Sequence, residues 1–425
     1  MMILKNNLRK GSIYVLFLLL LSACANQKLR TTFKENDRLE PAFRGFVLYD
    51  PSTDKTLVNY DGAKYFTPAS NTKLFTFYST YRTFKDSVKS LAYYQTNDSL
   101  IIKGTADPSF WYGFDTEKTH SFLKNSTDTI YLVDAHIDDP VYGPGWSWDD
   151  FETYYMPEKS LFPVHSNLVN IKVEGGSVQS EPAYFSNFIE VVDSIQYTRD
   201  FYTNTFYRPK QGDFSTTVPF RTSNAVVVEL LKERLQKEVV LIPNKAYPFS
   251  YFYGMHYDEL LKQMMVVSDN FIAEQLMLQV AKETTGIYSV QKGIAYVLEN
   301  YLADLPQPPR WVDGSGLSRY NLFSPEDMVH LLTKMYREIP LDKLLSFFPV
   351  GGQSGTLTNW YTIDGAPFVY AKSGSLSNNY NLSGYLRAKS GKILIFSFMN
   401  NHYTKKTADI KKEMEFILKD IYYTN

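Results

Sequence analysis

Disulfides, metal-binding motifs and net charge are nearly absent from this 425-residue chain. Cys24 is the only cysteine, so no intrachain disulfide can form. The six histidines are scattered, and neither a His-Glu-x-x-His motif nor a cysteine pair occurs. No glycine-rich loop has the lysine spacing that holds phosphates. The formal charge of −1 gives no basis for nucleic-acid binding, which requires a basic face. We therefore expect no metal, no cofactor and no nucleic-acid partner.

Long apolar runs are missing outside the N-terminus. Residues 13–21 form an apolar run that is too short for a permanent membrane span but has the length of a signal-peptide core. Three basic residues precede this run: Lys5, Arg9 and Lys10. The run ends in Leu-Ser-Ala-Cys, which resembles a bacterial lipobox. This pattern predicts a signal peptide over residues 1–23, lipidation of Cys24 and a polar tether over residues 24–40.

Lipidation would fix the cellular location. Two or more acyl chains hold a protein stably on a membrane. We expect a periplasmic protein that is anchored through Cys24. Ala25 and Asn26 supply no acidic residue after the cysteine, which favours the outer membrane.

Aromatic residues are abundant, with 33 tyrosines and 29 phenylalanines. An aromatic-rich core explains this composition, and stacking on carbohydrate or peptide is the alternative. Apolar residues make up 44% of the chain and charged residues 21%, which is typical of a globular protein. The length predicts two or three domains.

The hydrophobic pattern predicts one domain interrupted by an insert. Residues 45–49 and 56–60 are predicted to form a hairpin, and residues 70–84 carry a helical apolar stripe. Residues 86–225 are rich in turn residues and short strand-like runs, which predicts an inserted β-rich domain. Further elements are expected later in the chain, namely helices over 226–237, 257–267 and 271–282 and a hairpin over 382–387 and 392–399. Residues 41–85 and 226–425 are therefore assigned to the main domain.

A serine and a lysine at positions i and i+3 share a helix face, as Ser70 and Lys73 would. Serine is a weak nucleophile that needs a base, and a lysine with a lowered pKa can supply it. The spacing alone is not specific, because four pairs have it: Ser52/Lys55, Ser70/Lys73, Ser121/Lys124 and Ser289/Lys292. Only Ser70 follows a Pro-Ala lead-in and precedes an apolar helix, where backbone N–H groups favour developing negative charge.

Ser268, Asp269 and Asn270 occur between two predicted helices. A helix N-cap made by Ser268 or Asp269 is the structural alternative to a catalytic role.

Lys372, Ser373 and Gly374 follow a predicted strand and precede Ser375. A lysine and a hydroxyl on a strand edge, beside a glycine that allows close approach, suit a bound carboxylate. The same Ala-Lys-Ser-Gly letters recur at residues 388–391, where a turn between two strands explains them.

Residues 313–316 read Asp-Gly-Ser-Gly and lack the spacing of a nucleophile elbow. We expect a tight structural turn here, near the site, in which Ser315 is not a nucleophile.

The three motifs in this order resemble the S-x-x-K, S-D-N and K-[ST]-G set of penicillin-binding proteins and class A β-lactamases. Longer stretches resemble the class C penicillin-binding proteins, the D-alanyl-D-alanine carboxypeptidase/endopeptidase family. These stretches are residues 68–74, 105–108, 143–146, 268–274, 313–321, 371–376 and 382–385. The long segment between Ser70 and Ser268 suits this family better than a β-lactamase. Ser373 replaces the usual threonine and keeps its hydroxyl.

The resemblance implies an α+β fold, with an antiparallel sheet flanked by helices and a β-rich insert. It also implies a role for each motif. Ser70 would attack the carbonyl of a D-Ala-D-Ala or D-Ala-diaminopimelate bond after Lys73 takes its proton. Ser268 would pass a proton to the leaving amine, and Asn270 would orient Lys73 and the substrate.

The third motif would bind the substrate. Lys372 and Ser373, next to Gly374, would hold its terminal carboxylate, and the N–H groups of Ser70 and Ser375 would form the oxyanion hole. Peptidoglycan peptides are the expected substrates, and β-lactams the expected inhibitors. Two alternatives are a β-lactamase or esterase on the same fold, and an inactive, lipid-anchored wall-binding protein.

Overall fold

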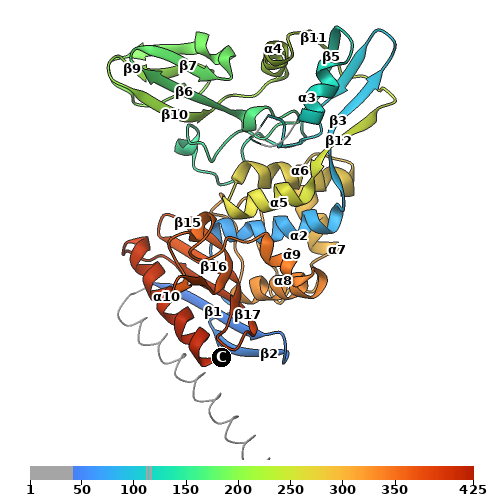
Figure 1. Cartoon of the computed structure of the whole chain (residues 1–425). Helices are drawn as coiled ribbons and strands as arrows, with labels where there is room; N and C mark the ends of the chain where they lie inside the picture. The colour runs from blue at the N-terminus through green and yellow to red at the C-terminus, as the bar shows by residue number, and fades with distance from the viewer. Residues whose placement is uncertain (1–41, 112, 114–116) are drawn as a thin grey trace, which may run out of the picture. The chain divides into compact units, whose positions relative to one another are not determined.

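The described part of the chain comprises residues 42–111, 113 and 117–425. In this computed structural model the chain divides into two compact units, whose elements are labelled in Figure 1. The first unit contains residues 42–71, Leu305–Pro309 and Leu322–Asn425, and the second contains Thr72–Asp304 and Arg310–Asn321. The predicted signal peptide, Cys24 and the tether lie outside the described residues.

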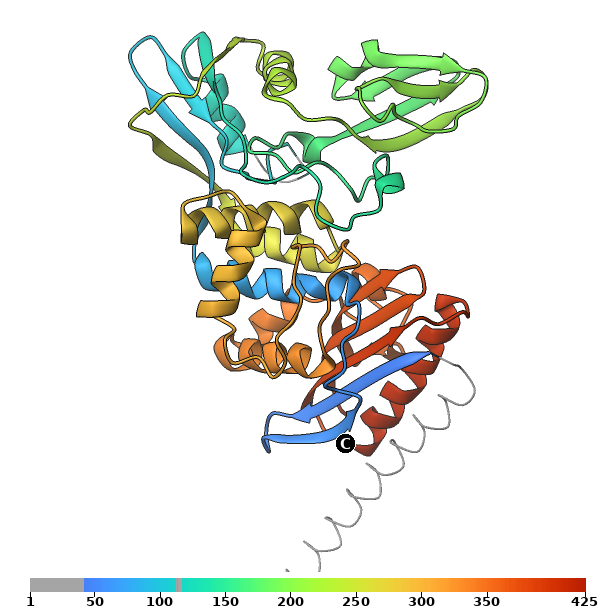
Figure 2. The same ribbon diagram turned by 180° about the vertical axis from the view of Figure 1, so that it is seen from behind.

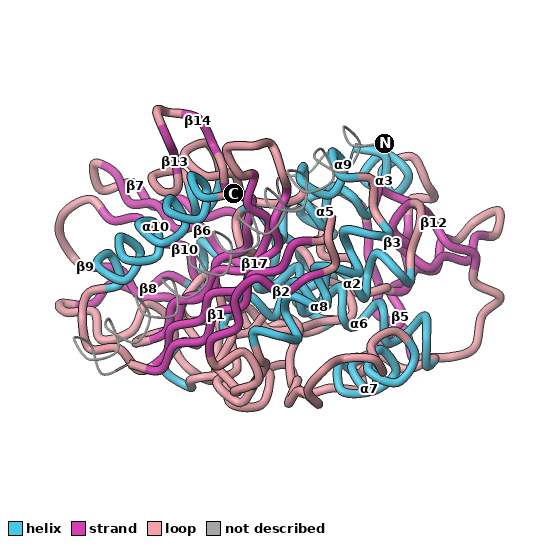
Figure 3. The backbone as a smooth tube through the Cα atoms, turned by 90° about the horizontal axis from the view of Figure 1, so that it is seen from below, coloured by secondary structure: helices cyan, strands magenta, loops and turns pink. Residues whose placement is uncertain are grey.

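A five-stranded antiparallel sheet in the order β15-β16-β17-β1-β2 forms the centre of the first unit. Strands from both ends of the described chain share this sheet, and Figures 2 and 3 show the β1–β2 hairpin beside the C-terminal strands. The strands are β1 (Phe43–Asp50), β2 (Lys55–Tyr60), β15 (Val369–Leu376), β16 (Asn379–Arg387) and β17 (Ile393–Asn401).

Helices α8 (Pro325–Glu338) and α10 (Thr407–Thr424) cover opposite faces of this sheet. Leu382 of β16 belongs to the hydrophobic core that α10 completes. Successive strand residues point to opposite faces. Tyr385 accordingly points the other way, and its hydroxyl donates to the carbonyl of Leu332 on α8 at 2.9 Å. Every residue of β17 is buried, as expected for a strand covered on both faces. Three short elements, α9 (Leu341–Ser346), β13 (Thr362–Ile363) and β14 (Ala366–Pro367), complete the unit.

Helix α6 is the centre of the helical part of the second unit. All its residues from Phe271 to Ala281 are buried, because neighbouring helices pack around it. Asp269 caps its N-terminus by accepting from the Ile272 N–H at 2.9 Å. Gly286 ends it with a φ of 79°. The helices are α2 (Lys73–Thr83), α5 (Tyr257–Val266), α6 (Asn270–Thr285) and α7 (Val290–Asn300).

A mixed sheet in the order β11-β5-β4-β3-β12 forms the β-rich part of the same unit. Helices α3 (Glu117–Lys124) and α4 (Asn224–Leu235) share its hydrophobic core. Its strands are β3 (Ser87–Gln95), β4 (Leu100–Lys103), β5 (Thr129–Asp134), β11 (Glu238–Pro243) and β12 (Ser250–His256). Two smaller sheets contain β6 (Leu168–Glu174), β7 (Ser177–Glu181), β8 (Ile189–Val192), β9 (Phe206–Pro209) and β10 (Phe214–Pro219).

Strand pairing crosses the boundary that we predicted at residue 225. Strand β11 pairs with β5, and β12 pairs with β3. The structure thus places residues 238–256 in one sheet with the predicted insert, whereas we expected them in the main domain.

The mixed α+β fold and both predicted hairpins are confirmed. The helix predicted over residues 70–84 is partly wrong, because a 3-10 turn (Ala69–Thr72) precedes the α-helix, which begins at Lys73. Among the described helices, none has both the length and the apolar character needed to cross a bilayer.

Candidate active site

The predicted site residues fall in both units. Ser70 and the strand segment from Lys372 to Ser375 belong to the first unit, and Lys73, Ser268 and Asn270 to the second. The chain passes from one unit to the other between residues 71 and 72. Ser70 and Lys73 are therefore three residues apart on one continuous helical segment.

Ser70 lies half-buried in the 3-10 turn. The preceding Ala69 has a φ of 49°, which is a left-handed conformation that residues other than glycine rarely adopt. Such strain is maintained only where the surrounding structure fixes it, and it occurs often at functional sites.

Polar side chains of the sheet hold the Ser70 segment in place. The Thr67 N–H donates to Asn401 Oδ1 at 2.7 Å, and Asn381 Nδ2 donates to the Thr67 carbonyl at 2.9 Å. Asn71 Nδ2 donates to Ser383 Oγ at 2.8 Å. These side chains are buried, so each needs a hydrogen-bond partner. They fix the backbone on both sides of Ser70.

Strand β15 passes directly against the same turn. A Cβ atom at Gly374 would lie 2.3 Å from the Pro68 carbonyl oxygen and 3.0 Å from the Ser70 nitrogen. The motif from Lys372 to Ser375 is thus brought beside Ser70, as predicted. Ser373 Oγ donates to Thr356 Oγ1 at 2.7 Å, and the buried Lys372 Nζ donates to the Ser373 carbonyl at 2.8 Å.

The second Lys-Ser-Gly copy lies in the turn between β16 and β17, where Gly391 has a φ of 86°. Its predicted role as a turn is confirmed.

Lys73 is fully buried, and the acceptors of its ammonium group include a side-chain amide and a backbone carbonyl. Nζ donates to Asn270 Oδ1 and to the Ser315 carbonyl, both at 2.6 Å. Burial lowers the pKa of Lys73 to about 8, although the negative charges of Asp313, Asp269 and Glu274 act in the opposite direction.

Ser268 and Asp269 form the short connection between α5 and α6, as predicted. Ser268 has a φ of 65°, and Asp269 is the N-cap of α6. The structural alternative, a helix N-cap, is therefore confirmed for Asp269. Asn270, the first residue of α6, uses both ends of its amide: Oδ1 accepts from Lys73, and Nδ2 donates to the Tyr155 carbonyl at 2.9 Å.

Asp313 organises the turn that presents the Ser315 carbonyl. Its buried carboxylate accepts from the N–H groups of Gly316 at 2.9 Å and Ser318 at 2.6 Å. It also accepts from Asn321 Nδ2 at 2.7 Å and Trp146 Nε1 at 3.0 Å. The predicted structural turn is confirmed, and Ser315 is completely buried within it.

Glu274 lies one helical turn after Asn270 and is the residue whose importance we did not predict. Its Oε1 accepts from the Ser315 N–H at 2.8 Å, so the residue that accepts from Lys73 is itself held by α6. Oε2 is buried without a hydrogen-bond partner. Burial and the nearby Asp313 raise the pKa of Glu274 to about 7, against the lowering effect of Lys159.

Among the described residues, no group of three or more His, Cys, Asp or Glu side chains is arranged to hold a metal ion.

Comparison with known families identifies this arrangement. The family model described as D-Ala-D-Ala carboxypeptidase 3 (S13) matches residues 25–198 and 230–421, which is most of the chain. The chain belongs to the S13 family.

Curated relatives of this S13 chain have similar lengths. A penicillin-sensitive carboxypeptidase A from Dictyostelium discoideum is 24% identical, over 85% of this chain and 83% of the relative. The D-alanyl-D-alanine carboxypeptidase DacB of Haemophilus influenzae is 23% identical, over 85% of this chain and 86% of the relative. The crystal structure of penicillin binding protein 4 from Haemophilus influenzae matches with a TM-score of 0.75 and 21% identity, covering 92% of this chain and 99% of that one. This last match confirms the expected fold.

The close approach at Gly374 generates a prediction. If Ser70 is the nucleophile, a Gly374→Ala substitution in this S13 protein should slow its acylation by benzylpenicillin about a hundredfold, because the new methyl group displaces the backbone that carries the serine. Stopped-flow or quenched mass spectrometry measures the acylation rate.

Gly391→Ala is the matched control in the second Lys-Ser-Gly copy. Nothing lies within 4 Å of a Cβ there, although the positive φ makes the substitution strained. It should lower the free energy of unfolding by about 1 kcal/mol and leave acylation unchanged. Equal acylation rates in both variants would contradict the assigned role of Gly374.

Proposed function

We propose that this S13 protein is a serine D-alanyl-D-alanine carboxypeptidase/endopeptidase that acts on peptidoglycan stem peptides and their crosslinks. The observation that carries the proposal is the environment of Lys73. It is a buried lysine with a pKa near 8, placed three residues after Ser70 and held by two acceptors.

The hydrogen bonds of Lys73 define how it can act as a base. A charged ammonium group has three N–H donors, whereas a neutral amine has two donors and one lone pair. Asn270 Oδ1 and the Ser315 carbonyl accept two hydrogen bonds. In the neutral form two donors suffice for these two acceptors, and the amine carries a lone pair that can accept a proton from Ser70.

The proposed reaction then has two steps. Ser70 Oγ attacks the substrate carbonyl while Lys73 takes its proton, and collapse of the tetrahedral intermediate expels the D-amino acid amine, which Ser268 helps to protonate. Water hydrolyses the resulting ester and restores Ser70. We assign the oxyanion hole to the N–H groups of Ser70 and Ser375.

Lys372 and Ser373 are the proposed carboxylate site. A buried lysine beside a hydroxyl favours a charged hydrogen-bond acceptor, and the terminal carboxylate of the substrate is one. A β-lactam carries a carboxylate beside a strained amide and would acylate Ser70 in the same way.

Product analysis tests this function. The purified chain should release D-alanine from a stem pentapeptide and cleave a crosslinked dimer, and both activities should fall about 10⁴-fold or more in a Ser70→Ala variant. Mass spectrometry of the products measures each rate. Rapid hydrolysis of benzylpenicillin without peptide cleavage would indicate a β-lactamase, and no turnover of any substrate would indicate an inactive wall-binding protein.

We also propose that a lipid on Cys24 anchors the protein in the periplasm, at the outer membrane. The support is the basic, apolar and Leu-Ser-Ala-Cys sequence of residues 5–24. A Cys24→Ser substitution should move the protein from the membrane fraction to the soluble fraction of lysed cells. An unchanged membrane fraction would overturn the proposed anchor.

A further inference from the structure

Three large aromatic side chains in the second unit are strongly exposed. Trp148 is 66% exposed, Tyr154 65% and Tyr202 78%. We refer to these three residues as the aromatic rim. Single exposed aromatics are common on protein surfaces, so exposure alone indicates nothing. The aromatic rim differs because contacts connect its backbone segments to Asn270 and fix them in place.

The segment that carries Trp148 and Tyr154 contacts the candidate active site directly. Tyr155 accepts from Asn270 Nδ2 through its carbonyl at 2.9 Å. The Tyr155 hydroxyl donates to Asp150 Oδ1 at 2.7 Å, and the Thr153 N–H donates to the Asp150 carbonyl at 2.9 Å. Tyr154 thus adjoins the residue whose carbonyl contacts Asn270, and Trp148 lies in the same segment. Asn270 in turn contacts Lys73.

Aromatic and polar contacts hold the loop of Tyr202 against the same segment. Its ring meets the ring of Phe201 edge-on at 5.0 Å, and Phe201 meets Phe151 edge-on at 4.9 Å. Thr198 Oγ1 donates to Glu152 Oε2 at 2.7 Å. The loop that carries Tyr202 thus packs on residues 151 and 152.

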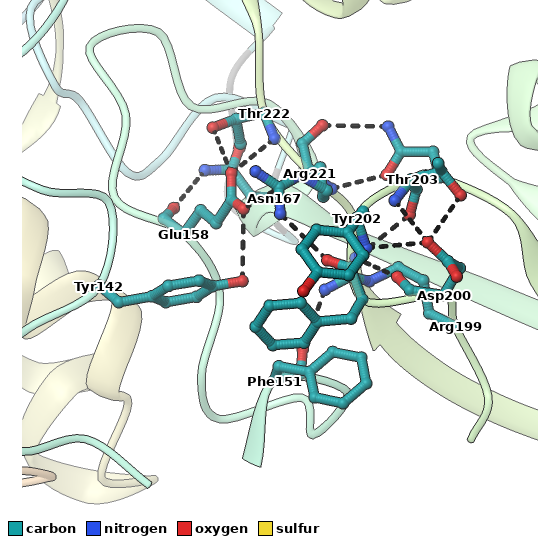
Figure 4. A network of polar contacts seen from close by, with 12 residues as sticks. Tyr142, Phe151, Glu158, Asn167, Arg199, Asp200, Tyr202, Thr203, Arg221 and Thr222 are labelled. Carbon is teal, nitrogen blue, oxygen red and sulfur yellow. Dashed lines mark hydrogen bonds and ion pairs between the residues drawn. The ribbon is translucent and has the colours of Figure 1, made fainter. Parts of the chain in front are cut away.

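The side chain of Arg199 stabilises this packing through hydrogen bonds to the backbone, as Figure 4 shows. It is completely buried, and its guanidinium donates to the carbonyls of Phe151 at 3.3 Å, Asp200 at 2.7 Å and Thr203 at 3.2 Å. Asp200 Oδ1 accepts from the N–H groups of Tyr202 and Thr203, both at 2.8 Å. A buried guanidinium is costly unless its donors are used. Here Nη1 and Nη2 hold two backbone segments, at Phe151 and at residues 200–203, while Nε is buried without a hydrogen-bond partner. Exposed rings on a fixed backbone lose little conformational entropy when they bind a ligand.

The charges around the rim restrict the ligand. Residues 146–156 include Asp149, Asp150 and Glu152 but no lysine or arginine. Near Tyr202 the charges are mixed, because the half-exposed Arg221 donates to the Phe201 carbonyl at 3.0 Å and Asp200 is acidic. Asp149, which follows Trp148 in the chain, is exposed. An acidic ligand is disfavoured beside Trp148 and Tyr154, whereas hydroxyl groups can donate to carboxylates and apolar C–H faces can pack on aromatic rings. Sugar rings have both features.

We propose that the aromatic rim binds the sugar rings of the glycan strand that carries the stem peptide, while the peptide reaches the site at Lys73 and Asn270 in the same unit. The identity of this polymer rests on the proposed function. The rim would make the enzyme prefer peptides that are still attached to glycan over free peptides.

A pair of substrates tests the proposal. The same stem pentapeptide is supplied free and attached to a short glycan strand, and kcat/KM is measured for D-alanine release from each. Replacing Trp148, Tyr154 or Tyr202 by alanine should lower kcat/KM for the glycan-borne peptide about 3-fold to 10-fold per ring and leave the free peptide unchanged. Tyr154→Phe and Tyr202→Phe, which keep the ring, should retain most of the preference.

Tyr253→Ala is the matched control, because Tyr253 is 52% exposed in the same unit but lies on β12. It should change neither substrate. Equal losses on both substrates in the rim variants, or no loss on either, would overturn the proposal.

Direct binding separates failure of the rim from failure of the proposed function. The purified full chain is titrated with the tetramer of N-acetylglucosamine, and tryptophan fluorescence is recorded for the wild type and for Tyr154→Ala. Saturable binding that weakens in the variant supports the rim even if neither peptide is cleaved. Absence of binding in the wild type overturns it even if both peptides are cleaved.

Discussion

Removal of the Lys73 ammonium group from water is the constraint on which the proposed active site depends. Lys73 is completely buried, and burial lowers its pKa to about 8. An ordinary lysine has a pKa of about 10.4 and is almost entirely protonated at neutral pH, when it cannot accept a proton. The desolvated lysine is available as a base over a useful range of pH. The cost of burying it is offset by hydrogen bonds to Asn270 and to the Ser315 carbonyl.

Much of the second unit serves to hold these two acceptors. Helix α6 places Asn270 in its first turn and Glu274 in its second, and Glu274 fixes the N–H of Ser315. The Asp313 carboxylate accepts four hydrogen bonds and so stabilises the turn that contains Ser315. Glu274 is buried, its Oε2 has no hydrogen-bond partner, and burial raises its pKa to about 7. Its charge state therefore adjusts the pKa of Lys73.

Local sequence patterns predicted the individual helices and strands more successfully than the pairing of strands that are far apart in the chain. The hairpins at both ends of the sheet and the connection before α6 follow from alternation, turn residues and helix caps, which are local properties. The pairing of β11 with β5 and of β12 with β3 joins residues far apart in the chain, and no local pattern specifies it. The 3-10 turn at Ala69 departs from the predicted helix because packing against Gly374 and Asn401 fixes that backbone.

The same distinction applies to the site. The motif residues were identified from the sequence by resemblance, and the structure brings the third motif beside Ser70 and Asn270 beside Lys73. Glu274 and Asp313 were part of recognised stretches, but their hydrogen bonds depend on three-dimensional packing. Asn401 had a usable signal, since it ends a largely apolar strand, whereas Asn381 lies in a strand of mixed polar and apolar residues and had none. The Tyr155 carbonyl is a backbone group and has no sequence signal.

The most direct test is the pH dependence of Ser70 acylation by a β-lactam, measured between about pH 6 and pH 10. If Lys73 is the base, the rate rises with pH as Lys73 loses its proton, with a midpoint near 8. Glu274→Gln removes a negative charge that raises the pKa of Lys73, so it should shift this midpoint about one unit lower. Glu283→Gln, on an exposed part of the same helix, should leave it unchanged. A midpoint near the ordinary lysine value, or no shift in Glu274→Gln, would contradict the account.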